Sequence, residues 1–113
     1  MLAGRGELAG IRLLKAETVE LMIRNQLPES LIPIDKMPRE RYGGFGFGFS
    51  VRVHKTDWVP ASEIGEYGWV GGASTEFWIS PRDDLTLITL AHQLPFSQLS
   101  FKLKSIVYDA IVD

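Results

Sequence analysis

The hydrophobic positions of this chain predict a helix near each end and three strands between them. The first helix covers Ala16–Gln26, where Val19, Met22 and Ile23 recur at helical spacing and Leu21 widens the apolar face. A Leu-Pro pair directly afterwards ends it, because the residue before proline disfavours helical geometry. Before this helix, a short apolar stretch that follows glycines predicts a short strand or turn over residues 8–14.

Large apolar residues alternate with small ones along residues 43–53, which predicts a strand with one apolar face. The apolar positions are Phe45, Phe47, Phe49, Val51 and Val53. The opposite positions are Gly46, Gly48, Ser50 and Arg52. Because this second face is mostly small, we expect another part of the chain to pack closely against it.

Two further strands are predicted at Gly68–Ile79 and Leu85–His92, joined by a turn at Pro81–Asp84 as an antiparallel hairpin. The closing helix covers Ser97–Val112. Its predicted apolar face consists of Leu99, Leu103, Ile106, Val107, Ala110 and Ile111. We therefore expect an α+β fold, a single domain over residues 1–113, with both helices on one face of a three-stranded antiparallel sheet. One edge of so small a sheet would be bare.

Composition excludes several function classes. With 12 basic and 14 acidic residues interspersed, the chain has no basic stripe for nucleic acid and no basic amphipathic helix for a membrane surface. It has no cysteine, so disulfides and thiolate metal sites are excluded, and nothing in the sequence calls for a metal or other cofactor. The N-terminus has no signal-peptide pattern, and the compartment is unassigned.

Nucleophile motifs are absent from the sequence. None of the eight serines is followed three positions later by lysine, and none lies in a Gly-x-Ser-x-Gly elbow. The two histidines, His54 and His92, follow the first and third predicted strands, so they would meet if those strands end on the same side. Among the tryptophans, Trp78 suits the core, whereas Trp69 lies between glycines and is the better candidate for a ligand surface.

Several segments, in order, resemble the C-terminal part of the serine β-lactamase-like hydrolases, the penicillin-binding-protein-like and class C-related family that includes many esterases. They are Gly6–Met22, Asn25–Glu29, Gly44–Arg52, Gly65–Trp69 and Ala73–Pro81. The resemblance implies a partial β-lactamase-like α/β sandwich, in which a sheet flanked by N- and C-terminal helices carries one wall of the active site.

In that family, a Lys-Thr-Gly, His-x-Gly or Trp-x-Gly element lies on the strand that lines the cleft, and Trp69-Val70-Gly71 stands at this place. By resemblance, Trp69, Val70 and Gly71 would contact substrate, and the backbone N–H of Gly72 would be one oxyanion-hole donor. The Ser-x-x-Lys nucleophile and the Tyr-x-Asn element of the family are both missing. Tryptophan in place of the lysine favours an ester- or acyl-transfer-like relative over a penicillin-recognising one.

Three hypotheses follow. The chain is a C-terminal fragment of a serine hydrolase that handles ester, amide or peptide-like compounds, inactive alone and prone to self-association through an exposed sheet edge or face. Alternatively, it is a non-catalytic binding or interaction module whose glycine-lined strand holds a small ligand. In the third hypothesis, it is an enzyme by another route, with His54 or His92 as the base.

Overall fold

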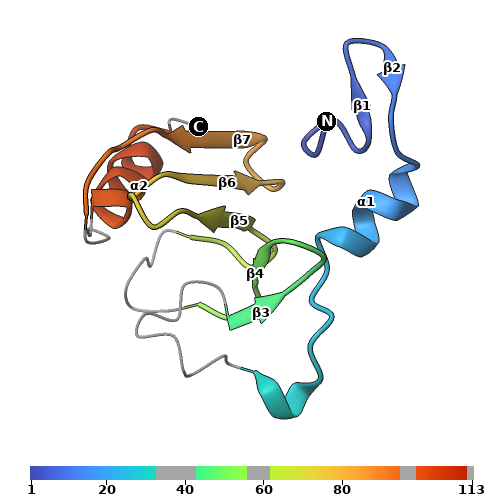
Figure 1. The fold of residues 1–113 in the computed structure, drawn as a ribbon, viewed down its shortest axis with the longest axis horizontal. Helices are drawn as coiled ribbons and strands as arrows, with labels where there is room; N and C mark the ends of the chain where they lie inside the picture. Colours follow the sequence, from blue (N-terminus) through green and yellow to red (C-terminus); the bar gives the residue numbers. More distant parts are fainter. Residues whose placement is uncertain (33–42, 56–61, 95–98, 112–113) are drawn as a thin grey trace.

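A computed structural model describes residues 1–32, 43–55, 62–94 and 99–111 of the chain, with the backbone alone for residues 99–101. Figure 1 shows the strands of the main sheet side by side, with one α-helix on either side of them and the hairpin near the N-terminus set apart. The elements, in order, are β1 (Glu7–Leu8), β2 (Ile11–Arg12), α1 (Ala16–Met22), the 3-10 turn η1 (Glu29–Leu31), β3 (Gly43–Phe45), β4 (Ser50–Arg52), β5 (Tyr67–Val70), β6 (Glu76–Ser80), β7 (Leu85–Thr89) and α2 (Leu99–Asp109).

The main sheet has five strands in the order β3-β4-β5-β6-β7, all antiparallel, so the prediction of three strands is wrong. The predicted strand over residues 43–53 is in fact the hairpin β3–β4. The chain reverses where Gly46 N–H donates to the carbonyl oxygen of Phe49 at 2.8 Å, and Gly48 takes a left-handed φ of 93°. Alternation of side chains cannot reveal such a turn, because glycine suits both strands and turns. Phe47 therefore lies at the hairpin tip, 57% exposed, and not on the predicted apolar face.

The predicted strand over residues 68–79 is likewise a hairpin, β5–β6. Gly71 N–H donates to the carbonyl oxygen of Thr75 at 2.8 Å, and Ser74 reverses the chain with a φ of 65°. The predicted hairpin between the following strands is confirmed as β6–β7, in which Ser80 pairs with Leu85 across the turn. The third predicted strand ends three residues early, at Thr89.

The two α-helices pack on opposite faces of the sheet, so the prediction that they share one face is wrong. Neighbouring residues of a strand point to opposite faces. Ile79 belongs to a buried cluster with Val51 and Tyr67 that packs against Ile23 at the end of α1. Trp78, the next residue along, is fully buried on the other face and stacks on Tyr108 of α2, with ring centroids 5.5 Å apart. The expectation that Trp78 belongs to the core is confirmed.

The small residues of the first hairpin allow the close packing that the sequence predicted. The carbonyl oxygen of Met22, the last residue of α1, accepts the N–H of Phe47 at 2.9 Å. A Cβ added to Gly46 would lie 2.0 Å from that same oxygen. α1 ends at Met22, four residues before the predicted end, because the next residues turn to pair with β3: Gln26 N–H donates to the carbonyl oxygen of Phe45 at 2.7 Å.

Near the N-terminus, the predicted short strand is a two-stranded hairpin, β1–β2, in which Arg12 pairs with Glu7 at 3.0 Å. Leu2 packs against the cluster of Val51, Tyr67 and Ile79, which joins the N-terminal segment to the sheet. Among the described residues, no helix is both long and apolar enough to cross a membrane.

Replacing Gly46 by alanine tests the close contact between α1 and the first hairpin. We expect Gly46→Ala to lower the free energy of unfolding by about 1–3 kcal/mol, because the new methyl group meets a backbone oxygen that cannot move independently. Urea denaturation followed by circular dichroism measures the change. Gly72→Ala is the matched control, since an added Cβ there meets no atom within 4 Å. Equal stability of the two variants would contradict the packing described.

Candidate functional site

A groove of about 340 Å³ lies where β5 ends, β6 begins and β7 ends. Trp69, Phe77 and Ile88 are cross-strand neighbours on one face of the sheet and form its apolar wall. Val70, Gly71 and Leu90 also line the groove. The structure therefore brings together the three residues of the Trp-x-Gly element at one surface groove, on neighbouring positions at the end of a strand.

Trp69 is held in place although it is 38% exposed. Its ring meets that of Phe45 edge-on, with centroids 5.2 Å apart. Such a contact fixes the plane of an aromatic ring and leaves one of its faces available. The indole can therefore offer an apolar surface to a ligand with little loss of side-chain entropy on binding.

The turn that follows Trp69 and Val70 is braced by the segment after β7. Ser74 Oγ donates to the carbonyl oxygen of Gln93 at 2.9 Å, and Gln93 N–H donates to the carbonyl oxygen of Ala73 at 3.0 Å. Within the turn, the N–H of Gly71 is committed to Thr75, whereas Gly72 is exposed beside the groove. The assignment of Gly72 N–H as an oxyanion-hole donor is compatible with this position and stays a prediction.

The two histidines do not meet. β4 and β7 are three antiparallel steps apart in the sheet, so they run in opposite directions and their carboxyl ends lie at opposite ends of the sheet. His54 follows β4, with its ring against Gly43, and His92 is exposed after β7. In the described part of the chain, no three His, Asp or Glu residues are grouped so as to hold a metal ion. The third tryptophan, Trp58, which could also contribute to a ligand surface, lies outside the described residues.

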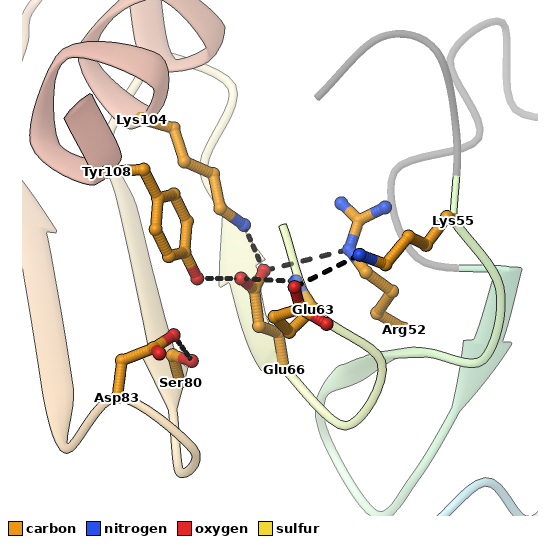
Figure 2. Close-up of polar contacts among 8 residues, drawn as sticks. All are labelled: Arg52, Lys55, Glu63, Glu66, Ser80, Asp83, Lys104 and Tyr108. Carbon is orange, nitrogen blue, oxygen red and sulfur yellow. Dashed lines mark hydrogen bonds and ion pairs between the residues drawn. The ribbon is translucent and has the colours of Figure 1, made fainter. Parts of the chain in front are cut away.

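Apart from the groove, a polar cluster that the sequence did not predict is buried between α2 and the sheet (Figure 2). Its centre is the carboxylate of Glu66, directly before β5, which accepts hydrogen bonds from Lys104 Nζ and Tyr108 Oη of α2. Arg52 of β4 lies 3.6 Å from the same carboxylate, measured from Nε to Oε2. The Glu63 backbone N–H donates to its other oxygen at 3.1 Å. We call these four side chains, Arg52, Glu66, Lys104 and Tyr108, the Glu66 cluster.

The environment of the cluster shifts two pKa values. Burial lowers the pKa of Lys104 to about 8, an effect that Glu66 opposes and Arg52 reinforces. The Lys104 ammonium also lies 4.4 Å from the centre of the Trp78 ring. Burial, together with the adjacent Glu66 carboxylate, raises the pKa of Tyr108 well above its ordinary value. Glu66, Lys104 and Arg52 are all buried, so within the described residues the cluster joins α2 to the sheet in the interior.

The cluster also corrects the predicted face of the closing helix. The residues of α2 that meet the sheet include Lys104 and Tyr108, four positions apart, whereas Ile106 of the predicted apolar face is 62% exposed. The spacing of Lys104 and Tyr108 was visible in the sequence, since residues four apart share one side of a helix. Their partners, Glu66 and Arg52, are far away in sequence, and no local pattern marks them as buried.

The stability of the chain should depend on pH through Lys104. The unfolded chain keeps this lysine protonated up to its ordinary pKa of about 10.4, whereas the folded chain releases the proton near pH 8. Between these values the unfolded state binds more protons, so the free energy of unfolding contributed by Lys104 rises with pH, by at most about 1.4 kcal/mol per pH unit.

Urea denaturation of the wild type and of Lys104→Met at pH 7.5, 8.5 and 9.5 measures this contribution. The wild type should gain stability with pH relative to the variant. Lys102→Met, which removes an exposed lysine of the same helix, should keep the slope of the wild type. Parallel profiles for the wild type and Lys104→Met would show that Lys104 does not change its protonation on folding in this range.

Comparison with known proteins supports the fold. No protein-family model and no curated protein matches the chain. Solved structures of simvastatin synthase (LovD) from Aspergillus terreus do match. The LovD9 mutant aligns with a TM-score of 0.69 and 22% identity over 86% of this chain and 30% of its own. The unliganded selenomethionyl derivative aligns with a TM-score of 0.67 and 16% identity, over 95% of this chain and 29% of its own.

The LovD6 mutant gives a TM-score of 0.68 at 22% identity, over 86% of this chain and 29% of its own. At this level of identity, the matches establish the fold alone. The chain spans less than a third of the length of the synthase chains that it matches. The predicted resemblance is thus confirmed as one of structure: the chain has a partial β-lactamase-like fold, similar to part of the fold of simvastatin synthase.

Proposed function

We propose that the chain supplies the sheet wall of the substrate cleft of a β-lactamase-like serine hydrolase, and that it does not hydrolyse substrate unaided. The observation that carries this proposal is the groove at the end of β5, which presents Trp69, Val70 and Gly71 within a partial β-lactamase-like fold. The serine nucleophile and its lysine would come from the part of such a hydrolase that these 113 residues do not contain.

The groove suits an acyl compound with an apolar group. Trp69, Phe77 and Ile88 would contact the apolar part. The peptide group of the exposed Gly72, directly after the lining residue Gly71, would face the carbonyl group. When a serine attacks that carbonyl, negative charge develops on its oxygen, and the N–H of Gly72 would stabilise it together with the N–H of the nucleophile. By resemblance, Trp69 stands at the position that holds lysine in the β-lactamases. Unlike lysine, tryptophan has no positive charge with which to bind a substrate carboxylate, and this favours ester substrates.

The second candidate function is a binding module without catalysis. It is favoured by the fact that the described residues form the groove by themselves, with Trp69 fixed against Phe45 and the turn after it braced by Gln93. Such a module would bind the same class of ligand, and its function would need no nucleophile. Adding the complementary part of a hydrolase distinguishes the two functions. Ester turnover would then appear if the chain supplies a cleft wall, and would not appear if the chain is a binding module.

The isolated chain should bind a small acyl compound and leave an ester intact. We expect no release of p-nitrophenol from p-nitrophenyl butyrate above the rate in buffer. The stable amide N-phenylbutanamide should shift the NMR signals of the Trp69 indole and of the Gly71 and Gly72 amides. Trp69→Ala should weaken binding roughly tenfold, since an aromatic contact contributes about 1 kcal/mol beyond its area.

Ile106→Ala is the control, because it removes an exposed apolar side chain of α2, which packs on the face of the sheet opposite to the groove. Two outcomes would overturn the proposal. One is the absence of shifts at Gly71 and Gly72 up to the solubility of the amide. The other is ester turnover by the purified chain that disappears in His54→Ala or His92→Ala. That result would make the chain an enzyme in which a histidine acts as the base.

A further inference from the structure

A second cavity, of about 400 Å³, lies between α1, the N-terminal segment and the turn that joins β6 to β7. Val19 of α1 and Tyr67 and Ile79 of the sheet line its inner end, and all three are buried. Leu2 and Leu85 add apolar walls. None of the residues that line this cavity lines the groove described above. These walls are all supplied by this chain, so they do not depend on another part of a hydrolase.

Tyr67 brings an unused hydrogen-bonding group to this cavity. Its side chain lines the cavity and is 1% exposed, and no described residue forms a hydrogen bond with its hydroxyl. Burial raises the pKa of this tyrosine, so the hydroxyl stays protonated and is available as a donor. A buried hydroxyl without a partner is unfavourable and rare in native proteins, so this one calls for an acceptor from outside the described residues.

Water is a poor occupant of the inner end of the cavity. An ordered buried water normally makes about three hydrogen bonds. Of the buried side chains in the wall, only Tyr67 and Ser80 are polar, and Ser80 Oγ already donates to Asp83 Oδ2 at 2.7 Å. An apolar space with a single free donor suits a mostly apolar molecule that has one acceptor.

The charges and the size of the cavity restrict its ligand further. At the mouth, Arg5 is paired with Glu20, and Asp84 adds a negative charge that disfavours an anion. A charged group would also lose its hydration against the apolar inner end. The volume lies at the lower end of the range of about 300–1,000 Å³ that is usual for small-molecule sites. Because Val19 and Tyr67 line the inner end and are each only 1% exposed, it is too narrow for a helix or a strand.

We propose that this cavity binds a small uncharged molecule with a compact apolar body and one carbonyl oxygen, which accepts the hydrogen bond of Tyr67. The apolar body would contact Val19, Ile23 and Ile79. Because the cavity lies between α1, the N-terminal segment and the sheet, the bound molecule would contact all three and stabilise the folded chain. The inference does not rest on the proposed function, since the cavity and the groove have no lining residue in common.

Camphor, a compact uncharged ketone, is the probe that tests this site. Titration should shift the methyl NMR signals of Val19, Ile23 and Ile79 and should raise the unfolding temperature. Tyr67→Phe should raise the dissociation constant of camphor about fivefold, which is the loss expected for one neutral hydrogen bond. Without camphor, this variant should unfold at the same or a higher temperature than the wild type, because it removes a buried hydroxyl that has no partner.

The two sites can be tested separately in the same chain. Trp69→Ala should leave the affinity for camphor unchanged, and N-phenylbutanamide should shift the amides of Gly71 and Gly72 equally in the wild type and in Tyr67→Phe. Three results would each overturn the proposal. They are the absence of methyl shifts up to the solubility of camphor, equal affinities of the wild type and Tyr67→Phe, and a lower unfolding temperature of Tyr67→Phe without camphor. The last result would show that the hydroxyl already has a partner within the fold.

Discussion

The buried carboxylate of Glu66 is the interaction on which the arrangement of this small fold depends. It receives a lysine and a tyrosine from α2 and lies beside an arginine from β4, so one side chain joins the helix to the middle of the sheet. Removing either member of a buried pair leaves an uncompensated charge, at a cost of about 3–5 kcal/mol. The cluster therefore selects the one rotation of α2 in which Lys104 and Tyr108 face the sheet. That rotation leaves Ile106 exposed.

Because of this constraint, the residues that stabilise the fold differ from those that form the candidate site. Glu66 precedes β5, whereas Trp69, Val70 and Gly71 lie at the other end of that strand. The cluster fixes the first end of β5 and the Trp78 face of the sheet, while α1 supports the opposite face through Ile23. The far end of β5 needs only a braced turn to hold the groove in shape. A change in the groove can thus alter binding without loosening the attachment of α2.

The sequence predicted the types of element well and their boundaries less well. Amphipathic spacing located both helices, and the β6–β7 hairpin followed from the proline and aspartates between its strands. Two hairpins were mistaken for single strands, because Gly46–Phe49 and Gly71–Thr75 turn within stretches whose composition suits a strand. The predicted apolar face of α2 was wrong for another reason. A lysine and a tyrosine are ordinarily surface residues, and only their long-range partners, Glu66 and Arg52, make their burial favourable.

The candidate site depends on a local motif instead, and the contact of its residues with a substrate stays a prediction. Trp69, Val70 and Gly71 are neighbours in sequence, so a local motif sufficed to bring them together, and the structure adds the groove formed with Phe77 and Ile88 from two other strands. What a local motif cannot supply is a nucleophile held about 3 Å from the carbonyl carbon it attacks. Acyl transfer requires both that serine and an oxyanion donor at one point in space. Since Gly72 could provide only the second, the proposed acyl chemistry would require a further element that meets the sheet at the mouth of the groove.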